Sequence, residues 1–511
     1  MNQVKAGSIL TYAQMGLSTV ISLVYTPIML RLLGQSEYGL YSTISSVISM
    51  LSVLNLGFSS SYMRFYMRYK VEADYQGIAK LNGLFITIFS IIGTTAFALG
   101  LLLSFNLELV FDKGLTAEEY AKAQVLMIMF SLSLGLSFPM SVFSSIITAN
   151  EEFVFQKSLN MGKTVLSPLL TIPMLLLGYG SIGMVAIAVC VTLAVDIGNM
   201  IFCFIRLNTR FSFGEWQKGL FKQIAVFSSF IAINMIVDQI NTNVDKVIIG
   251  RYRGTGEVSV YNIGATLSGY MQLFALAVSS VFTPRIHTMV TCSKDEKEVN
   301  NSISELFIRV GRIQFLILGL VVSGVVFFGK PFIKYWAGEG YDNSYYVTLL
   351  LALPSVIPWI QSVGVEIQRA KNKHQYRSII YGTMAIINVI ISIFLCQKFG
   401  AVGSALGTAI AVLFANVIIM NVVYKKVLGI DVGRFFLNIL RQLLGMIIPF
   451  AIGTVIMIFI PVNSVWVLLG LIIAYAIIYC FCVWFMSMNI YEKSLIKDII
   501  KKIFAKSKKK V

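Results

Sequence analysis

Four polar residues recur at helical spacing inside the apolar stretch "FIAINMIVDQINTNVDKVIIG". Asn234, Asp238, Asn241 and Asp245 are separated by four, three and four positions, so a helix places them along one face, with Lys246 beside them. A carboxylate in such a stretch is costly and calls for a binding role. We expect this face to line a polar cavity, where Asp238 binds a coupling proton or sodium ion or pairs with a mobile cation. Asp245 and Lys246 also fit a role as anchors near a membrane surface.

Other charged residues in or beside apolar stretches present two interpretations each. Asp196 is either a cavity residue or a carboxylate that is hydrogen-bonded within its own helix bundle. Arg64 and Arg68 are one helical turn apart, a spacing suited to a diphosphate, although charges that anchor a membrane helix explain them as well. Arg309 and Arg312 present the same two alternatives.

The composition identifies the elements that must position these residues. Hydrophobic residues make up 57% of the chain and charged residues only 13%, which is typical of an integral membrane protein. The apolar runs have the length of roughly 20 residues that a membrane helix needs, and helices satisfy their own backbone hydrogen bonds in lipid. We predict an all-α protein of about fourteen transmembrane helices, near residues 8–30, 38–63, 81–105, 120–148, 154–178, 181–205, 223–249, 257–283, 303–328, 344–368, 376–396, 400–424, 437–460 and 464–487.

The distribution of lysine and arginine predicts the orientation. If the N-terminus is cytoplasmic, most cations between the predicted spans, and the lysine-rich tail, fall on the cytoplasmic side. The positive-inside rule therefore predicts that both termini are cytoplasmic. The formal net charge of +17 is then mostly a consequence of topology. A nucleic-acid-binding function is not expected, because no loop is long enough to form a basic domain.

A sequence repeat predicts the domain organisation. Four residues of the first half recur at a constant offset (254 − 34 = 220): Arg31 as Arg251, Gly34 as Gly254, Glu37 as Glu257 and Tyr41 as Tyr261. The segment "YGSIG" at 179–183 likewise recurs as "FGAVG" at 399–403. This register superposes the first six spans on the next six in the same orientation, as in the parallel repeats of secondary transporters.

The predicted domains follow from this register. Residues 1–220 form a six-helix bundle, 221–435 a second bundle related to it by pseudo-symmetry, 436–490 two extra transmembrane helices, and 491–511 a basic tail. The tail is either an amphipathic helix on the inner leaflet or a solvated segment that only fixes orientation.

The repeated motif itself falls in short outer turns. Gly34 and Gly254 permit a tight turn, and Glu37 and Glu257 favour the positive dipole end of the helix that follows. We therefore expect a structural role, as part of an outer gate, for the residues Arg31, Glu37, Arg251 and Glu257.

Two segments carry a resemblance to a known family. "PIMLRLLGQSEYGLYS" followed by "NLGFSSSYMRFYMRY" resembles the N-terminal signature of the polysaccharide transporter, or Wzx-type oligosaccharide flippase, branch of the MATE-like MOP superfamily. The resemblance implies two six-helix bundles around a central cavity and a lipid-linked substrate. It implies that a polyprenyl-diphosphate-linked oligosaccharide moves from the inner to the outer leaflet by alternating access, for cell-surface polysaccharide assembly. It also implies a bacterial inner membrane, contact with membrane lipids and partners among polysaccharide-assembly proteins.

Alternative functions are a lipid II flippase or a multidrug or metabolite exporter of the same superfamily. A membrane polysaccharide polymerase fits least, because the predicted outer loops are too short to carry its catalytic groups and because this function does not explain the repeat. The sequence has two histidines and no HExxH, GxSxG or P-loop pattern, so we expect a transporter without catalytic residues rather than an enzyme. Neither a metal site nor a cofactor is predicted, and the coupling ion, if there is one, is left open.

Overall fold

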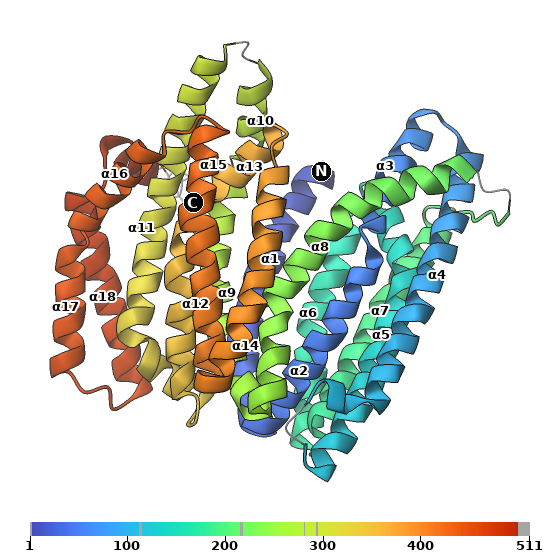
Figure 1. Cartoon of the computed structure of the whole chain (residues 1–511), viewed down its shortest axis with the longest axis horizontal. Coiled ribbons are helices and arrows are strands. Elements are labelled where there is room, and N and C mark those ends of the chain that lie inside the picture. Colours follow the sequence, from blue (N-terminus) through green and yellow to red (C-terminus); the bar gives the residue numbers. More distant parts are fainter. Residues whose placement is uncertain (1–2, 112–114, 215–217, 281, 293–294, 499–511) are drawn as a thin grey trace, which may run out of the picture. The chain divides into compact units, whose positions relative to one another are not determined.

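The computed structural model describes residues 3–111, 115–214, 218–280, 282–292 and 295–498, and every regular element in them is a helix (Figure 1). The prediction of an all-α fold is confirmed. The cause is the one expected from sequence: long apolar runs interrupted by short polar turns form helices whose backbone hydrogen bonds are made within each segment.

The chain folds into two compact units, Met1–Asn262 with Val389–Ser404 and Ile263–Asn388 with Ala405–Val511. The first unit contains α1 (Gln3–Leu33), α2 (Gln35–Leu51), the short helix η1 (Ser52–Asn55), α3 (Phe58–Val71), α4 (Tyr75–Phe105), α5 (Ala117–Ala149), α6 (Phe153–Leu176), α7 (Gly180–Ile205), α8 (Lys218–Arg253) and the start of α9 (Thr255–Ser280).

The second unit contains the rest of α9 and the following helices. These are α10 (Thr283–Cys292), α11 (Glu296–Ala337), α12 (Asp342–Ile360), α13 (Ser362–Ala370), most of α14 (Gln375–Val412), η3 (Leu413–Ile419), α15 (Met420–Lys426), α16 (Val432–Leu444), α17 (Ile447–Phe459) and α18 (Val465–Met486). Although α8 is predicted to open the second bundle, it packs on α2 and α3 in the first unit. The repeat with boundaries at 220 and 435 stays a prediction.

Eleven helices in the described residues are long and apolar enough to cross a membrane, or twelve if the bent pair α16 and α17 forms one span. Each of the fourteen predicted ranges overlaps a described helix. Relative to twelve, the difference of two (14 − 12 = 2) arises because α9 is not counted and because Gln375–Lys426 counts once, although its backbone leaves helical geometry at Gly400. The chain is a multi-pass membrane protein. The predicted tail, 491–511, is described only as far as residue 498, where it is helical, and residues 499–511 lie outside the described part.

Aromatic side chains form the core of the first unit, where α3, α4 and α5 meet. Tyr62 and Phe85 are fully buried with ring centroids 5.1 Å apart, and Phe89 stacks on Phe138 at 6.5 Å. Because α3 buries this face, its charged residues are directed to the other sides of the helix.

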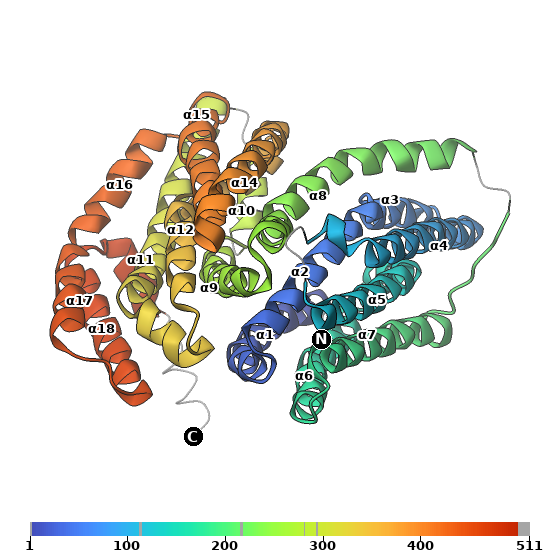
Figure 2. The ribbon, with the colours of Figure 1, turned by 60° about the horizontal axis from the view of Figure 1, so that its bottom comes forward.

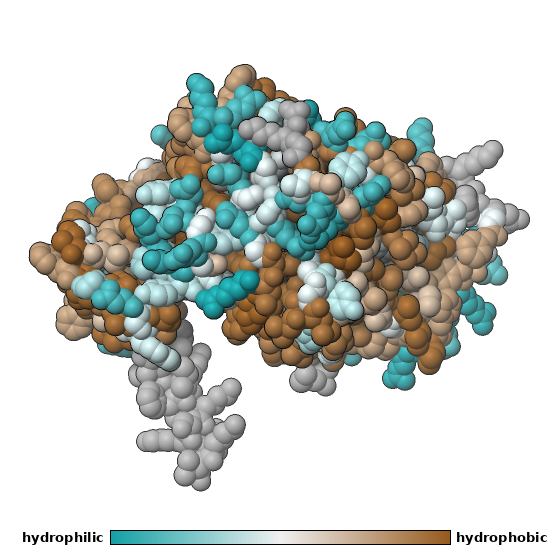
Figure 3. Space-filling model, turned by 90° about the horizontal axis from the view of Figure 1, so that it is seen from below, coloured by the Kyte–Doolittle hydropathy of each residue, from teal (hydrophilic) through white to brown (hydrophobic). Residues whose placement is uncertain are grey.

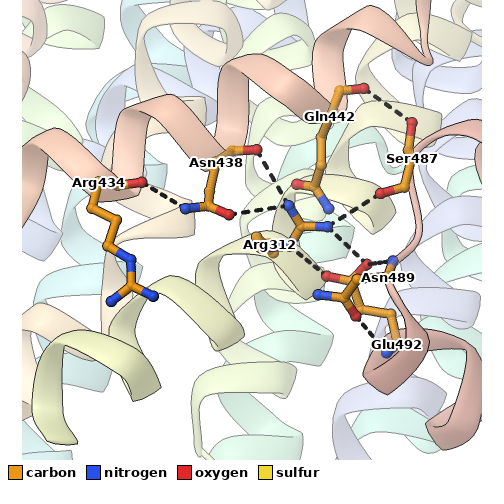
Figure 4. Close-up of polar contacts among 7 residues, drawn as sticks. All are labelled: Arg312, Arg434, Asn438, Gln442, Ser487, Asn489 and Glu492. Carbon is orange, nitrogen blue, oxygen red and sulfur yellow. Dashed lines mark hydrogen bonds and ion pairs between the residues drawn. The ribbon is translucent and has the colours of Figure 1, made fainter.

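A buried ion pair fixes the C-terminal helices of the second unit to α11 (Figure 4). Arg312 of α11 donates through Nε and Nη2 to the two carboxylate oxygens of Glu492, at 2.7 and 3.0 Å, and Nη2 also donates to the carbonyl oxygen of Ser487 at 3.1 Å. The side chains of Arg312 and Glu492 are 9% and 3% exposed. Of the two interpretations of Arg312, the structure supports a structural role.

The surface matches a protein of the lipid bilayer. Side chains of α4, α6, α17 and α18 expose large hydrophobic residues such as Ile91, Leu169, Ile458 and Phe481, each at least 60% exposed. Figure 3 shows hydrophobic residues over much of the surface.

Candidate functional site

A basic hollow of about 1070 Å³ lies between α3 and the start of α8, within the first unit. Figure 2 shows α8 running beside α2 and α3. The hollow is lined by Arg64, Phe65, Met67, Arg68, Val71 and Glu72 on one side and by Gly219, Lys222, Gln223 and Val226 on the other. Two of the predicted site residues, Arg64 and Arg68, therefore face one cavity.

Local sequence explains this placement of α3. The helix is interrupted after η1, where Leu56 and Gly57 adopt the left-handed φ values of 47° and 73°, and α3 starts at Phe58. Tyr62 and the other buried aromatics hold one face of α3 in the core. A hydrogen bond between the hydroxyls of Ser61 and Ser228, at 2.6 Å, joins α3 to α8.

The hollow carries a net positive charge. Arg64, Arg68 and Lys222 contribute three cations, and Glu72 contributes one carboxylate, which pairs with Arg68 at 3.3 Å. The Arg68 and Glu72 side chains are 61% and 51% exposed, so water weakens their attraction. Guanidinium groups that share one cavity with an ammonium suit a ligand with two phosphate groups.

The polar face predicted on α8 is present for three of its four residues. Asn234, Asp238 and Asn241 are all exposed, whereas Ala232 and Val237 are buried. The hydroxyl of Thr242 donates to the backbone carbonyl of Asp238 at 2.8 Å, one turn earlier in α8. Asn234, Asp238 and Asn241 thus follow one side of α8.

The fourth residue, Asp245, has a different environment. It is 3% exposed and its two carboxylate oxygens accept hydrogen bonds from the hydroxyls of Tyr261, at 2.7 Å, and Ser404, at 2.8 Å. These bonds join α8 to α9 and α14 inside the first unit. Asp245 is therefore separated from the exposed residues of the face, and the neighbouring Lys246 is half-buried.

Asp196 lies on α7, apart from the basic hollow. Its carboxylate accepts a hydrogen bond from the hydroxyl of Ser137 on α5, at 3.2 Å, and the side chain is half-buried. Lys163 of α6 interacts with it electrostatically. Asp196 thus links three helices of the first unit, as one of its two interpretations predicts.

The outer-turn motif forms tight turns with the expected geometry. Gly34 and Gly254, between α1 and α2 and between α8 and α9, have φ values of 78° and 90°. Arg31 is exposed in the last turn of α1, and Arg251 donates through Nη1 to the carbonyl oxygen of Leu109 at 2.9 Å.

The two glutamates of the motif bind the starts of other helices. Glu37 accepts a hydrogen bond from the backbone N–H of Ser181 at 2.6 Å and an ion pair from Lys122 Nζ at 3.0 Å. Glu257 accepts from the backbone N–H of Ala401 at 2.9 Å. The predicted structural role rests on these contacts as well as on the dipoles of α2 and α9.

The sequence alone does not indicate that Lys222 lines the basic hollow or that Lys122 pairs with Glu37. Lys222 belongs to the cations between the predicted spans, and nothing near it in sequence indicates Arg64 as its neighbour across the hollow. The recurrence of Glu37 and "YGSIG" at the same offset is the one signal that links Glu37 to residues 179–183.

Comparisons with known proteins agree with this architecture. A family model described as polysaccharide biosynthesis protein matches residues 28–346. No curated protein matches the chain. The chain is similar to the solved structure of the lipid II flippase MurJ in an inward closed conformation, at 19% identity and a TM-score of 0.72, over 96% of this chain and 99% of that one.

Two further solved structures are MATE transporters. An inward-facing multidrug resistance MATE family transporter of the MOP superfamily matches at 13% identity and a TM-score of 0.63, over 78% of this chain and 92% of that one. The Vibrio cholerae MATE transporter VcmN in its bent form matches at 15% identity and a TM-score of 0.53, over 84% and 97%. At such identities the similarity shows a shared fold.

Proposed function

The chain belongs to the polysaccharide biosynthesis protein family, and on that premise we propose that it is a flippase for a polyprenyl-diphosphate-linked oligosaccharide. The substrate moves from the inner to the outer leaflet by alternating access of two six-helix bundles, for cell-surface polysaccharide assembly. The protein acts in a bacterial inner membrane, alongside polysaccharide-assembly proteins, and changes no covalent bond.

The observation that carries this proposal is the basic hollow between α3 and α8. Arg64 and Arg68 face Lys222 in a space of about 1070 Å³, large enough for a diphosphate and its first sugar. A diphosphate cannot cross hydrocarbon unaided, because unpaired polar groups cost several kcal/mol each there. Three cations at one end of the membrane helices supply the compensating charge.

The exposed face of α8 supports a polar path that continues from this hollow. Lys222 lies on the same helix as Asn234, Asp238 and Asn241, so α8 carries both one cation of the basic hollow and the polar face. The carboxamides can bind sugar hydroxyls, since each offers both donors and acceptors. Asp238 supplies a carboxylate for a coupling proton or sodium ion.

The fold is shared with two other transport activities, which are the alternatives. The MurJ structure is a lipid II flippase, and the inward-facing MATE structure is a multidrug resistance transporter. A drug exporter for cations gains nothing from three cations around its cavity, so the hollow favours the lipid-linked substrate. A lipid II flippase shares the diphosphate and fits the hollow equally, so only the sugar distinguishes it.

Reconstitution into liposomes tests the proposal. Purified full-length protein is given three labelled substrates in parallel: a polyprenyl-diphosphate oligosaccharide, lipid II and a fluorescent cationic drug. We expect transfer of the oligosaccharide lipid to the opposite leaflet and no drug transport. Transfer of lipid II alone would assign the first alternative, and drug efflux without lipid transfer would assign the second.

A further inference from the structure

A second hollow with basic side chains lies beside α3, in the first unit, and the proposed function does not use it. It measures about 530 Å³ and lies among the end of α3, the start of α4, the end of α5 and the segment after α7. Its lining includes the polar residues Tyr66, Lys70, Asn82, Asn150, Thr209 and Arg210.

The second hollow is separate from the basic hollow of the proposed function. Tyr66 and Lys70 each follow an arginine of the first site, Arg64 and Arg68, by two positions. Two positions correspond to about 200° around a helix, so the two pairs point to opposite sides of α3. No residue lines both cavities.

A hydrogen-bond network gives the second hollow a fixed wall. Lys70 Nζ donates to the carbonyl oxygen of Ala149 and to Oδ1 of Asn150, both at 3.2 Å. The Asn150 amide donates to the hydroxyl of Tyr66 at 2.8 Å. The fully buried Asn82 accepts from Tyr62 and donates to the carbonyl oxygen of Arg210 at 3.0 Å, which fixes the segment after α7.

The charge of this wall is positive. Lys70 and Arg210 are the charged residues among those that line the hollow in the described part of the chain, and no acidic residue lines it. Lys70 has three donors, of which two are used on Ala149 and Asn150. The Arg210 guanidinium makes no hydrogen bond or ion pair with a described residue, so its donors are available to a ligand.

The position of the hollow indicates the kind of ligand. It is built from the ends of helices, where the chain leaves the hydrocarbon and meets lipid headgroups. Exposed Tyr75 and the apolar side chains of Ile78, Ile146 and Leu207 adjoin the polar wall. Tyrosine is enriched at this depth, and a site with cations beside apolar side chains matches a phospholipid, whose phosphate adjoins its acyl chains.

We propose that this hollow, between the ends of α3, α5 and α7, binds the phosphodiester headgroup of an acidic phospholipid. Lys70 and Arg210 contact the phosphate, and the amide of Asn208, which also lines the hollow, binds headgroup hydroxyls. The lipid stays in its leaflet and is not the transported substrate. The same cations and hydrogen-bond donors of the hollow also suit inorganic phosphate, so the test distinguishes the lipid from free phosphate.

Lipid association to the full-length protein in phosphatidylcholine vesicles provides the test. Spin-labelled phosphatidylglycerol and spin-labelled phosphatidylcholine are compared by electron paramagnetic resonance for their relative association constants. We expect the wild-type protein to prefer phosphatidylglycerol. Arg210→Gln should reduce that preference about fivefold, since one cation near an anionic lipid contributes about that factor.

Matched variants separate a binding role from a structural one. Lys70→Gln should lower the lipid preference as Arg210→Gln does, but it also removes a hydrogen bond to the end of α5. If Lys70→Gln does not fold, the result for Arg210→Gln alone tests the proposal. Arg206→Gln, an exposed cation that does not line the hollow, is the control. Equal lipid preference in Arg210→Gln and Arg206→Gln would overturn the proposal. Displacement of the labelled lipid by millimolar inorganic phosphate would assign the site to free phosphate instead. The experiment measures lipid association only, so a negative result would not affect the proposal of flippase activity.

Discussion

Glu37 and Glu257 make the same contact 220 residues apart (257 − 37 = 220). Glu37 accepts a hydrogen bond from the backbone N–H of Ser181, and Glu257 accepts one from that of Ala401, so the partners have the same offset (401 − 181 = 220). Each acceptor lies in the first turn of one helix and binds the N-terminal end of another helix 144 residues further along the chain. The carboxylates oppose the positive dipole ends of those helices.

Removal of either carboxylate should destabilise the protein by a similar amount. A hydrogen bond to a charged group contributes roughly 1.5–3 kcal/mol, so we expect Glu37→Ala and Glu257→Ala each to lower the free energy of unfolding by about 2 kcal/mol. Denaturant titration in detergent measures this. Glu118→Ala is the control, because Glu118 pairs with the same Lys122 but is 79% exposed. A negligible loss in either glutamate variant would contradict the equivalence.

The glycine before each bound N–H should be irreplaceable. Gly180 and Gly400 have φ values of 54° and 60°, and a Cβ atom would lie 2.4 Å from Glu37 Oε1 and 2.7 Å from Glu257 Oε2. We expect Gly180→Ala and Gly400→Ala to cost about 1–2 kcal/mol for the left-handed backbone alone. Gly162→Ala should instead raise stability, since Gly162 lies within α6 with open space around it. Thermal unfolding that ranks the three variants alike would refute this.

The Arg312–Glu492 pair should behave as a buried ion pair. Glu492→Gln leaves the Arg312 guanidinium buried without its counter-charge, so we expect the free energy of unfolding to fall by about 3–5 kcal/mol. The pair of Arg434 and Glu305 offers a matched comparison, because its side chains are 55% and 51% exposed. Glu305→Gln should cost less than about 1 kcal/mol. Equal losses of unfolding free energy in the two variants would show that the burial of Arg312 has no energetic consequence.

Asp238 should couple transport to a cation gradient. Asp238→Asn keeps the size of the side chain but removes its charge, so we expect flipping in liposomes to fall about tenfold and to lose its response to an imposed proton or sodium gradient. Asp342→Asn is the same change at an exposed site at the start of α12 and should leave both unchanged. Gradient-dependent flipping at the wild-type rate in Asp238→Asn would exclude the coupling role.

The helices could be predicted from sequence because each one depends on local composition. Apolar runs ended by glycine turns set their bounds, so α1 ends at Leu33 and α2 begins at Gln35, around Gly34. The count of spans was harder to predict. Gly400 separates two helical segments within the range of α14, and the N–H of Ala401 after it donates to Glu257, which is far away in the chain.

The candidate site could be predicted only where its residues share one helix. Arg64 with Arg68, and Asn234 with Asp238 and Asn241, were found from spacing alone. Asp245 fits the same spacing, yet Tyr261 and Ser404 bury it. Lys222 was missed as a member of the basic hollow for the same reason: which helix packs on which is decided by contacts that a single sequence does not display.

The basic hollow is tested most directly by the rate at which the Arg64→Gln/Arg68→Gln double variant flips a labelled polyprenyl-diphosphate oligosaccharide in liposomes. Arg206→Gln, a change at another exposed arginine of the first unit, controls for the loss of a cation outside the hollow. Two lost cations near a diphosphate predict a fall of at least about tenfold in the double variant. A double variant that flips the lipid as fast as Arg206→Gln and the wild-type protein would contradict the account.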